Sequence, residues 1–150
     1  MQPDADLRQQ LQPDMDRVRL ARDGQDVSHV VRLTMALAEA IGGPQRVDPA
    51  HTGAQVLRLM HSPSGVVYVS AGGFIAGEVS STIINPDPVA IEHGWFATDR
   101  SGLRLLDAFE AWAKDIGCVG VKMSTAAIPG GVGTILERRR YKPAELAWFR

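Results

Sequence analysis

Residues 89–117 constrain the fold of this chain most strongly, because their hydrophobic pattern changes period part-way along. In the first part, apolar and aromatic residues such as Ile91 and Trp95 alternate with their neighbours, which is typical of a strand. After a break at residues 99–102, apolar residues recur from Leu103 at three- and four-residue steps, which predicts a helix that ends near Gly117. The sequence therefore predicts a strand that passes through a tight turn directly into a helix N-terminus.

The start of that helix is a candidate anion site. Its first N–H groups have no partner within the helix, and the positive end of the helix dipole lies at the same place. Both properties favour a phosphate group. An ordinary strand–helix connection has the same pattern, so this feature alone leaves both interpretations open.

Composition predicts one soluble domain. The chain has 150 residues, of which 45% are hydrophobic and 22% charged, and it has no apolar run long enough to span a bilayer and no secretory signal. We expect residues 1–15, which are polar, to form a flexible arm and residues 16–150 to form a single domain in the cytoplasm. The formal charge of −1 provides no field that would attract nucleic acid or a membrane. The single cysteine, Cys118, excludes an internal disulfide and the usual zinc clusters, so we expect no metal site.

The order of predicted elements indicates a mixed α/β fold. The expected elements are a strand at 16–21, a helix capped by Asp26 or Ser28 that ends at Ile41, a helix at 49–61 capped by Asp48, strands at 66–70 and 74–84, the strand and helix within 89–117, a strand at 118–123, a short helix at 132–139 and a last strand at 144–149. This β-α-α-β-β-β-α-β-α-β order predicts a central, mostly antiparallel sheet with helices on both faces.

The same order and three local strings resemble the GNAT superfamily of N-acetyltransferases. Residues 74–79 (FIAGEV) are similar to the third strand of the family, residues 92–117 to its motif A, and residues 136–145 (LERRRYKPAE) to its C-terminal motif. The string GLRLLDAFEAW at residues 102–112 is similar to short GNAT proteins often carried by phages, which would place the protein in the host cytoplasm. The resemblance covers residues 16–150.

The resemblance implies an N-acyltransferase that takes an acetyl group from acetyl-coenzyme A, its cosubstrate, to an amine. In the family the pantetheine arm lies between the separated fourth and fifth strands, and the pyrophosphate lies on the turn and the first helical turn that follow. The corresponding residues here are Trp95, Phe96 and Ala97 for pantetheine, and Arg100, Ser101, Gly102, Leu103 and Arg104 for pyrophosphate. The turn is shorter than in the family, and Gly102 occupies its last small-residue position.

Three residues are candidates for the chemistry. The resemblance places Glu92 where many members hold the general base, although a solvent-facing strand carboxylate would have the same pattern. Simple alternation places His93 on the opposite face of the strand, as an alternative base or as a packing residue with one hydrogen bond. Leu136 occupies the position of the usual tyrosine acid, so Ser124, with Thr125, is the nearest hydroxyl that could replace it.

Two other function classes remain open at this stage. The shortened turn favours a binding or structural module that retains the GNAT fold without using coenzyme A. The basic residues Arg138, Arg139, Arg140 and Lys142 are compatible with a phage-type enzyme that modifies nucleic acid, and equally with a helix C-terminus that complements its dipole. The overall charge favours a small-molecule or protein amine as acceptor over nucleic acid. No membrane partner is expected, and exposed strand surfaces are compatible with a homodimer.

Overall fold

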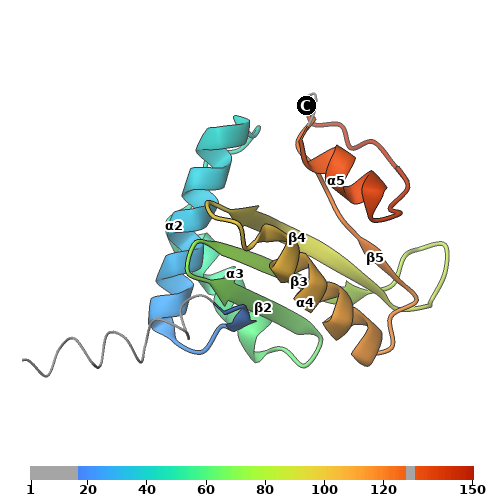
Figure 1. Cartoon of the computed structure of the whole chain (residues 1–150), viewed down its shortest axis with the longest axis horizontal. Coiled ribbons are helices and arrows are strands. Elements are labelled where there is room, and N and C mark those ends of the chain that lie inside the picture. The colour runs from blue at the N-terminus through green and yellow to red at the C-terminus, as the bar shows by residue number, and fades with distance from the viewer. Residues whose placement is uncertain (1–16, 128–130) are drawn as a thin grey trace, which may run out of the picture.

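In the computed structural model, which describes residues 17–127 and 131–150, a sheet carries helices on both of its faces (Figure 1). The elements are β1 (Arg19–Leu20), α2 (Gly24–Ile41), α3 (Pro49–His61), β2 (Gly65–Ser70), β3 (Gly73–Ser80), β4 (Val89–Ala97), α4 (Gly102–Asp115), β5 (Gly120–Lys122) and α5 (Val132–Arg138). The arm predicted at residues 1–15 lies outside the described residues. No helix in the described ranges is both long and apolar enough to cross a membrane.

The sheet has the strand order β1-β2-β3-β4-β5. The first four strands are antiparallel neighbours, whereas β4 and β5 run parallel. The parallel pair is connected through α4, as expected for a β-α-β unit. The predicted fold class, a mixed and mostly antiparallel sheet with helices on both faces, is therefore confirmed.

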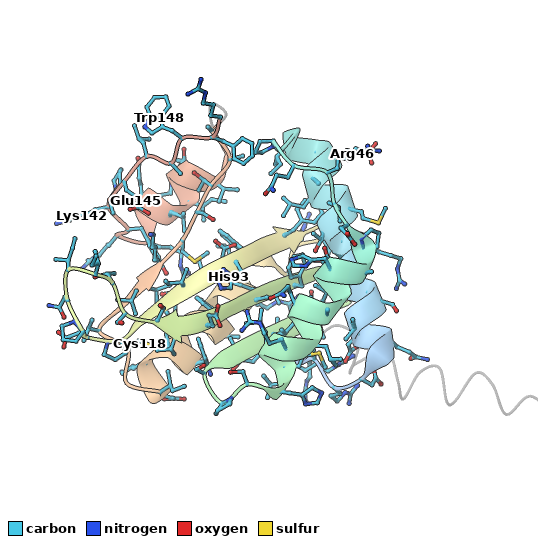
Figure 2. All side chains as sticks on the ribbon, turned by 180° about the vertical axis from the view of Figure 1, so that it is seen from behind. Arg46, His93, Cys118, Lys142, Glu145 and Trp148 are labelled. Atoms are coloured by element: carbon cyan, nitrogen blue, oxygen red, sulfur yellow. The ribbon has the colours of Figure 1, made fainter. Side chains whose placement is uncertain are left out.

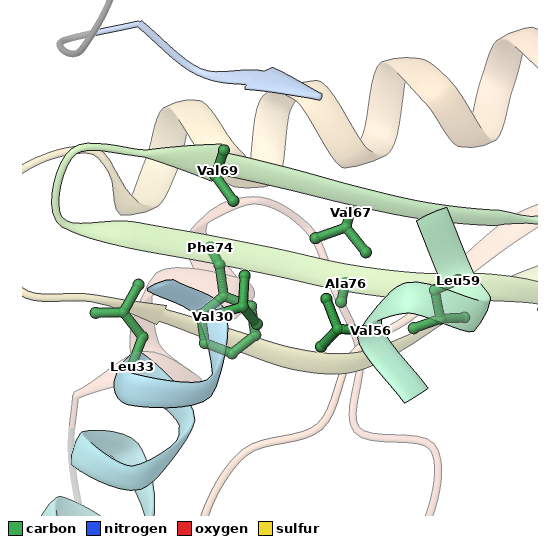
Figure 3. Packing of buried hydrophobic residues seen from close by; sticks show 8 residues of the cluster. All are labelled: Val30, Leu33, Val56, Leu59, Val67, Val69, Phe74 and Ala76. Carbon is green, nitrogen blue, oxygen red and sulfur yellow. The ribbon is translucent and has the colours of Figure 1, made fainter. Parts of the chain in front are cut away.

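Helices α2 and α3 cover one face of the sheet. Their buried side chains form one core cluster with strands β2 and β3, shown in Figure 3: Val30, Leu33, Val56, Leu59, Val67, Val69, Phe74 and Ala76. Asp48 caps α3 as predicted, because its carboxylate accepts the N–H of His51. The predicted caps of α2 are wrong: Asp23 accepts the N–H of Asp26, and the Asp26 carboxylate instead pairs with Arg19.

Helix α4 covers the opposite face. Leu105, Leu106 and Phe109 are completely buried in a second cluster, to which α5 contributes Leu136. The Phe109 ring packs over Gly77 of β3, where an added Cβ would lie 2.7 Å from the ring. Gly77 is therefore required for the close approach of α4 to the sheet.

Two predicted strand segments are wrong. Strand β3 ends at Ser80 rather than at residue 84, because the Thr82 hydroxyl accepts the N–H groups of Ile84 and Asn85 and turns the chain. Residues 144–149 form no strand. Strand β5 is only three residues long, so it has few backbone groups with which another strand could pair. Glu145 instead contacts β5 through an ion pair with Lys122.

Gly77→Ala tests the packing of α4 on the sheet. The new Cβ would lie 2.4 Å from the Ile91 carbonyl oxygen as well as against the Phe109 ring, so the backbone must shift. We expect the free energy of unfolding to fall by about 2–3 kcal/mol, measured by urea denaturation. As a matched control, Gly53→Ala in α3 places its Cβ at an ordinary 3.7 Å from Val27 and should raise stability by up to about 1 kcal/mol. Equal effects of the two substitutions would contradict this account.

Candidate active site

The site begins where β4 and β5 separate. The two strands pair only at Val89 with Gly120, Ala90 with Val121 and Ile91 with Lys122. Figure 1 shows β5 running away from β4 beyond this point, towards α5. Within the described residues, no strand pairs with this edge of β4 after Ile91. The second half of β4 therefore has a partner, β3, on one side alone.

A β-bulge in β4 lies at the same level. Gly77 of β3 is opposite Glu92 and Ala76 is opposite Gly94, which leaves His93 as the extra residue. The bulge breaks the two-residue alternation expected from the sequence. Trp95 packs in the α4 cluster, on the same face as Ala90, while the neighbouring Phe96 packs on the α2–α3 cluster.

Glu92 is a buried carboxylate at this point of separation. Its residue is 7% exposed, and its Oε2 atom accepts both the backbone N–H of Ser124, at 3.0 Å, and the Ser124 hydroxyl, at 2.9 Å. Burial raises the pKa of the Glu92 carboxyl, and the two bonds from Ser124 oppose that shift only in part. Ser124 follows β5, so the contact connects the two strands after their ladder has ended.

A cavity of about 620 Å³ opens beside Glu92. It is lined by Leu37 and Ile41 of α2, Glu92, His93, Gly94 and Trp95 of β4, Ser124, Thr125 and Ala126 after β5, and Gly131, Val132, Gly133, Thr134 and Glu137 at α5. A second depression, of about 850 Å³, lies at the start of α2 and is lined only by residues of that turn and its cap. The cavity beside Glu92 is the one that combines apolar walls with a buried titratable group, as binding sites commonly do.

His93 points away from Glu92 and is half exposed. Its Nε2 lies 2.9 Å from Oε1 of Glu78, which also pairs with Arg58 of α3. Figure 2 shows His93 on the face of the sheet that carries α3. Hydrogen bonds from Arg58 and His93 lower the pKa of Glu78. His93 and Glu92 thus point to opposite faces of β4, as predicted, although His93 also lines one rim of the cavity.

The start of α4 is held by a buried polar network. Ser101 is 1% exposed; its hydroxyl contacts that of Ser70 at 2.7 Å and donates to Asp99, which also accepts the Ser101 N–H. The Ser101 side chain forms no cap to the helix. Among the described residues, none accepts a hydrogen bond from the N–H group of Gly102 or Leu103. The first turn of α4 can therefore donate to an acceptor outside the chain.

The predicted site residues thus fall into two groups. Glu92, His93, Ser124 and Trp95 line the cavity. Outside its lining lie Phe96 and Ala97 at the end of β4 and residues 100–104 at the start of α4. Trp95 connects the groups, since its Nε1–H donates to the Gly102 carbonyl at 3.0 Å. Ser101 is buried, so its hydroxyl is not open to a ligand.

Sequence reasoning missed several cavity residues. Glu137 lies in the C-terminal string but has no predicted role, and Leu37 lies in the predicted helix that ends at Ile41, again with no predicted role. No pattern in the sequence places these residues together, because α2 and α5 come to the same cavity only in the folded structure. Within the described residues, no group of three His, Cys, Asp or Glu residues is placed to hold a metal ion.

Comparison with known proteins identifies the fold. No family model matches the sequence, and no curated protein matches it. Solved structures do: the aminoglycoside N-acetyltransferase AAC(6')-Iy in complex with CoA has a TM-score of 0.64 at 14% identity, covering 89% of this chain and 93% of that one. This is the GNAT acetyltransferase fold.

Two further solved structures are similar to this chain, and one of them is described as an acetyltransferase. An aminoglycoside acetyltransferase from an uncultured soil metagenomic sample, solved with sisomicin, has a TM-score of 0.62 at 16% identity and covers 92% of this chain and 95% of that one. A protein described as a transcriptional regulator, from Bacillus halodurans, has a TM-score of 0.72 at 14% identity and covers 89% and 97%. The resemblance to phage proteins stays a prediction.

Glu92→Gln tests whether burial controls the carboxyl. A carboxyl with a raised pKa in the folded state is stabilising while protonated, and this stability is lost as pH rises through the folded pKa. Glutamine cannot ionise but retains an oxygen that accepts from Ser124. We expect the variant and the wild type to have similar unfolding free energies near about pH 4, and the variant to become the more stable as pH approaches about 7, by about 1.4 kcal/mol for each unit of the shift.

The measurement is urea denaturation across this pH range. A wild type that gains stability over Glu92→Gln with rising pH would mean that the bonds from Ser124 outweigh burial, which would reverse the direction given above.

Proposed function

We propose that this chain is an acyl-coenzyme A-dependent N-acyltransferase, which transfers an acetyl group from acetyl-coenzyme A to an amine. The observation that carries the proposal is the separation of β4 from β5 directly beside a buried carboxylate and a cavity. A GNAT fold alone would not support an activity, because one fold serves many functions. Here the fold, the open strand edge and the carboxylate coincide.

The open edge of β4 supports a place for the pantetheine arm. Backbone groups of Trp95, Phe96 and Ala97 lie on the half of β4 that has no β5 partner. An extended chain with amide groups can bind such an edge through main-chain hydrogen bonds, as an added strand does. The acyl end would then reach the cavity next to Glu92.

The start of α4 supports a place for the pyrophosphate. The N–H groups of Gly102 and Leu103 are available to an anion, and the helix dipole adds to their attraction. Arg100 and Arg104 are exposed on the same turn and bring positive charge. These groups lie beyond the Trp95–Gly102 hydrogen bond, at a separate place from the cavity.

Glu92 is the residue that we assign as general base. A carboxyl with a raised pKa is a better base near neutral pH than an ordinary one. Glu92 would take one proton from the acceptor ammonium, directly or through water, and the amine nitrogen would then attack the thioester carbonyl. As the C–S bond breaks, the second proton lost by the nitrogen would pass through water to the departing thiolate. The backbone N–H of Trp95 or Phe96 would polarise that carbonyl.

The other two catalytic candidates have different roles in this proposal. The Ser124 hydroxyl donates a hydrogen bond to Glu92, so we assign Ser124 to positioning of the carboxylate rather than to protonation of the thiolate. His93 is engaged by Glu78 on the other face of β4, which leaves it less suited than Glu92 to act as the base.

One observation favours a second candidate, a GNAT-fold module that does not use coenzyme A. Asp99 places a carboxylate beside the start of α4, and its hydrogen bond from the Ser101 hydroxyl lowers its pKa, so it is ionised at neutral pH. A negative charge at this place opposes phosphate binding. Direct measurement of coenzyme A binding separates the two candidates.

Calorimetric titration with acetyl-coenzyme A provides that test, using two substitutions at Gly102. An added Cβ at Gly102 lies 3.6 Å from the Ala97 Cβ, an ordinary contact, so Gly102→Ala should retain affinity within about threefold. Gly102→Glu adds a carboxylate at the helix start and should weaken binding at least about tenfold by like-charge repulsion.

Each outcome of this titration has a definite meaning. Micromolar binding by the wild type and by Gly102→Ala, weakened in Gly102→Glu, supports the proposed pyrophosphate site. Absence of wild-type binding at millimolar ligand would remove the acyltransferase proposal and favour the module without coenzyme A. Equal binding by all three proteins would place the pyrophosphate elsewhere.

Glu92→Gln also tests the base. In a screen of primary amines followed by coenzyme A thiol release, we expect the variant to lose about a hundredfold or more in rate while its affinity for acetyl-coenzyme A is unchanged. A variant that retains the wild-type rate would exclude Glu92 as the base.

A further inference from the structure

The acidic side chains that line the cavity are not matched by lysine or arginine side chains. Two carboxylates line it, Glu92 and Glu137, while no lysine or arginine occurs in the lining that the structure describes. Residues 128–130 read Ile-Pro-Gly and add no charge wherever they lie. Among the described residues, a ligand in this cavity therefore meets negative side chains, and the lining includes no lysine or arginine as a partner for any anion of its own.

Several basic groups on the neighbouring elements are paired with other carboxylates, and others lie outside the lining. Lys122 of β5 pairs with Glu145, and Arg139, just after α5, pairs with Asp107 and Glu110 of α4. The imidazole of His93 contacts the Glu78 carboxylate. Arg138 and Arg140 are exposed at the end of α5 and are not part of the lining. The acidic character of the cavity is thus not offset by these groups.

The two carboxylates belong to different walls. Glu92 is buried on β4, whereas Glu137 is exposed on α5, the helix beyond the separated β5. Apolar side chains of α2, Leu37 and Ile41, complete the lining with Trp95. A volume of about 620 Å³ is within the range of small-molecule sites. The arrangement suits a molecule with an apolar middle and a positive group towards each carboxylate.

We infer that the acceptor is a small amine that carries a second cationic group, as a linear diamine or polyamine does, and no carboxylate. This inference rests on the proposed function for its reaction, with the reacting amine at Glu92 and the second cation at Glu137. An acceptor carboxylate would face like charge without a counter-ion, which penalises amino acids.

The charges outside the cavity agree with this assignment. Arg100 and Arg104 lie at the start of α4, near the groups proposed for the pyrophosphate. Positive charge therefore accompanies the anionic part of the cosubstrate, and negative charge accompanies the acceptor. The two ligands are directed to different ends of one site, which limits competition between them.

Binding of three matched amines tests the inference. Hexamethylenediamine, hexylamine and aminocaproate share a six-carbon chain and differ at the far end in carrying an ammonium, a methyl or a carboxylate group. In calorimetric titrations at neutral pH and low salt, without acetyl-coenzyme A, we expect the diamine to bind about tenfold more tightly than hexylamine, and aminocaproate to bind more weakly than both.

Two variants identify the carboxylate responsible. Glu137→Gln should reduce the preference for the diamine over hexylamine to about twofold or less. Asp87→Asn, which changes the net charge equally in the exposed β3–β4 loop, should leave the preference intact. A preference that survives Glu137→Gln would overturn the inference, and so would equal binding of the three amines or no binding up to about 10 mM.

Failure of this inference differs from failure of the proposed function. Because the titrations contain no acetyl-coenzyme A, a cation preference that depends on Glu137 can be found even if coenzyme A does not bind. The cavity would then be a cation site in a protein that is not an acyltransferase. Conversely, acetyl-coenzyme A binding without a cation preference would retain the proposed function and remove the acceptor class.

Discussion

The contact between Glu92 and Ser124 is the interaction on which the site depends. The backbone ladder between β4 and β5 ends at Ile91 and Lys122, and from there one carboxylate keeps the two chains together. It does so with side-chain atoms, so the strands can diverge while the chain after β5 stays attached to the sheet. Residues 124–126 and α5 form one wall of the cavity, and α5 is also attached through Leu136 in the α4 cluster and through the ion pairs of Arg139 with α4.

Much of the fold could be predicted from the sequence because local patterns and tertiary packing agree. Helix α3 occupies Pro49–His61 with Asp48 as its cap, as predicted, and Leu106 and Phe109, at three-residue steps from Leu103, are fully buried as their spacing indicates. The strand predicted at residues 144–149 failed for a non-local reason. A strand requires a neighbour, and β5 is too short to provide one, so the alternating pattern alone was insufficient.

The site was predictable only where it depends on local chemistry. Glu92 follows from the resemblance of its segment to motif A of the GNAT family, and the open start of α4 follows from the turn. The cavity could not be predicted, since its lining joins α2, β4 and α5 through the divergence of two strands. Glu137 illustrates this: its neighbours in sequence are basic, and only the fold brings it to the same cavity as Glu92.

The bulge at His93 adds one residue to β4 and so determines which face of the sheet the later side chains of the strand occupy. On one side of the bulge Ala90 faces α4, and on the other Trp95 does so, although the two residues differ in parity. A regular ladder over the same residues would turn Trp95 to the α2–α3 face and exchange it with Phe96, whereas deletion of the extra residue would keep Trp95 facing α4 without a bulge. The one extra residue therefore decides which of the two neighbouring aromatic rings of β4 packs under α4 and which packs under α2 and α3.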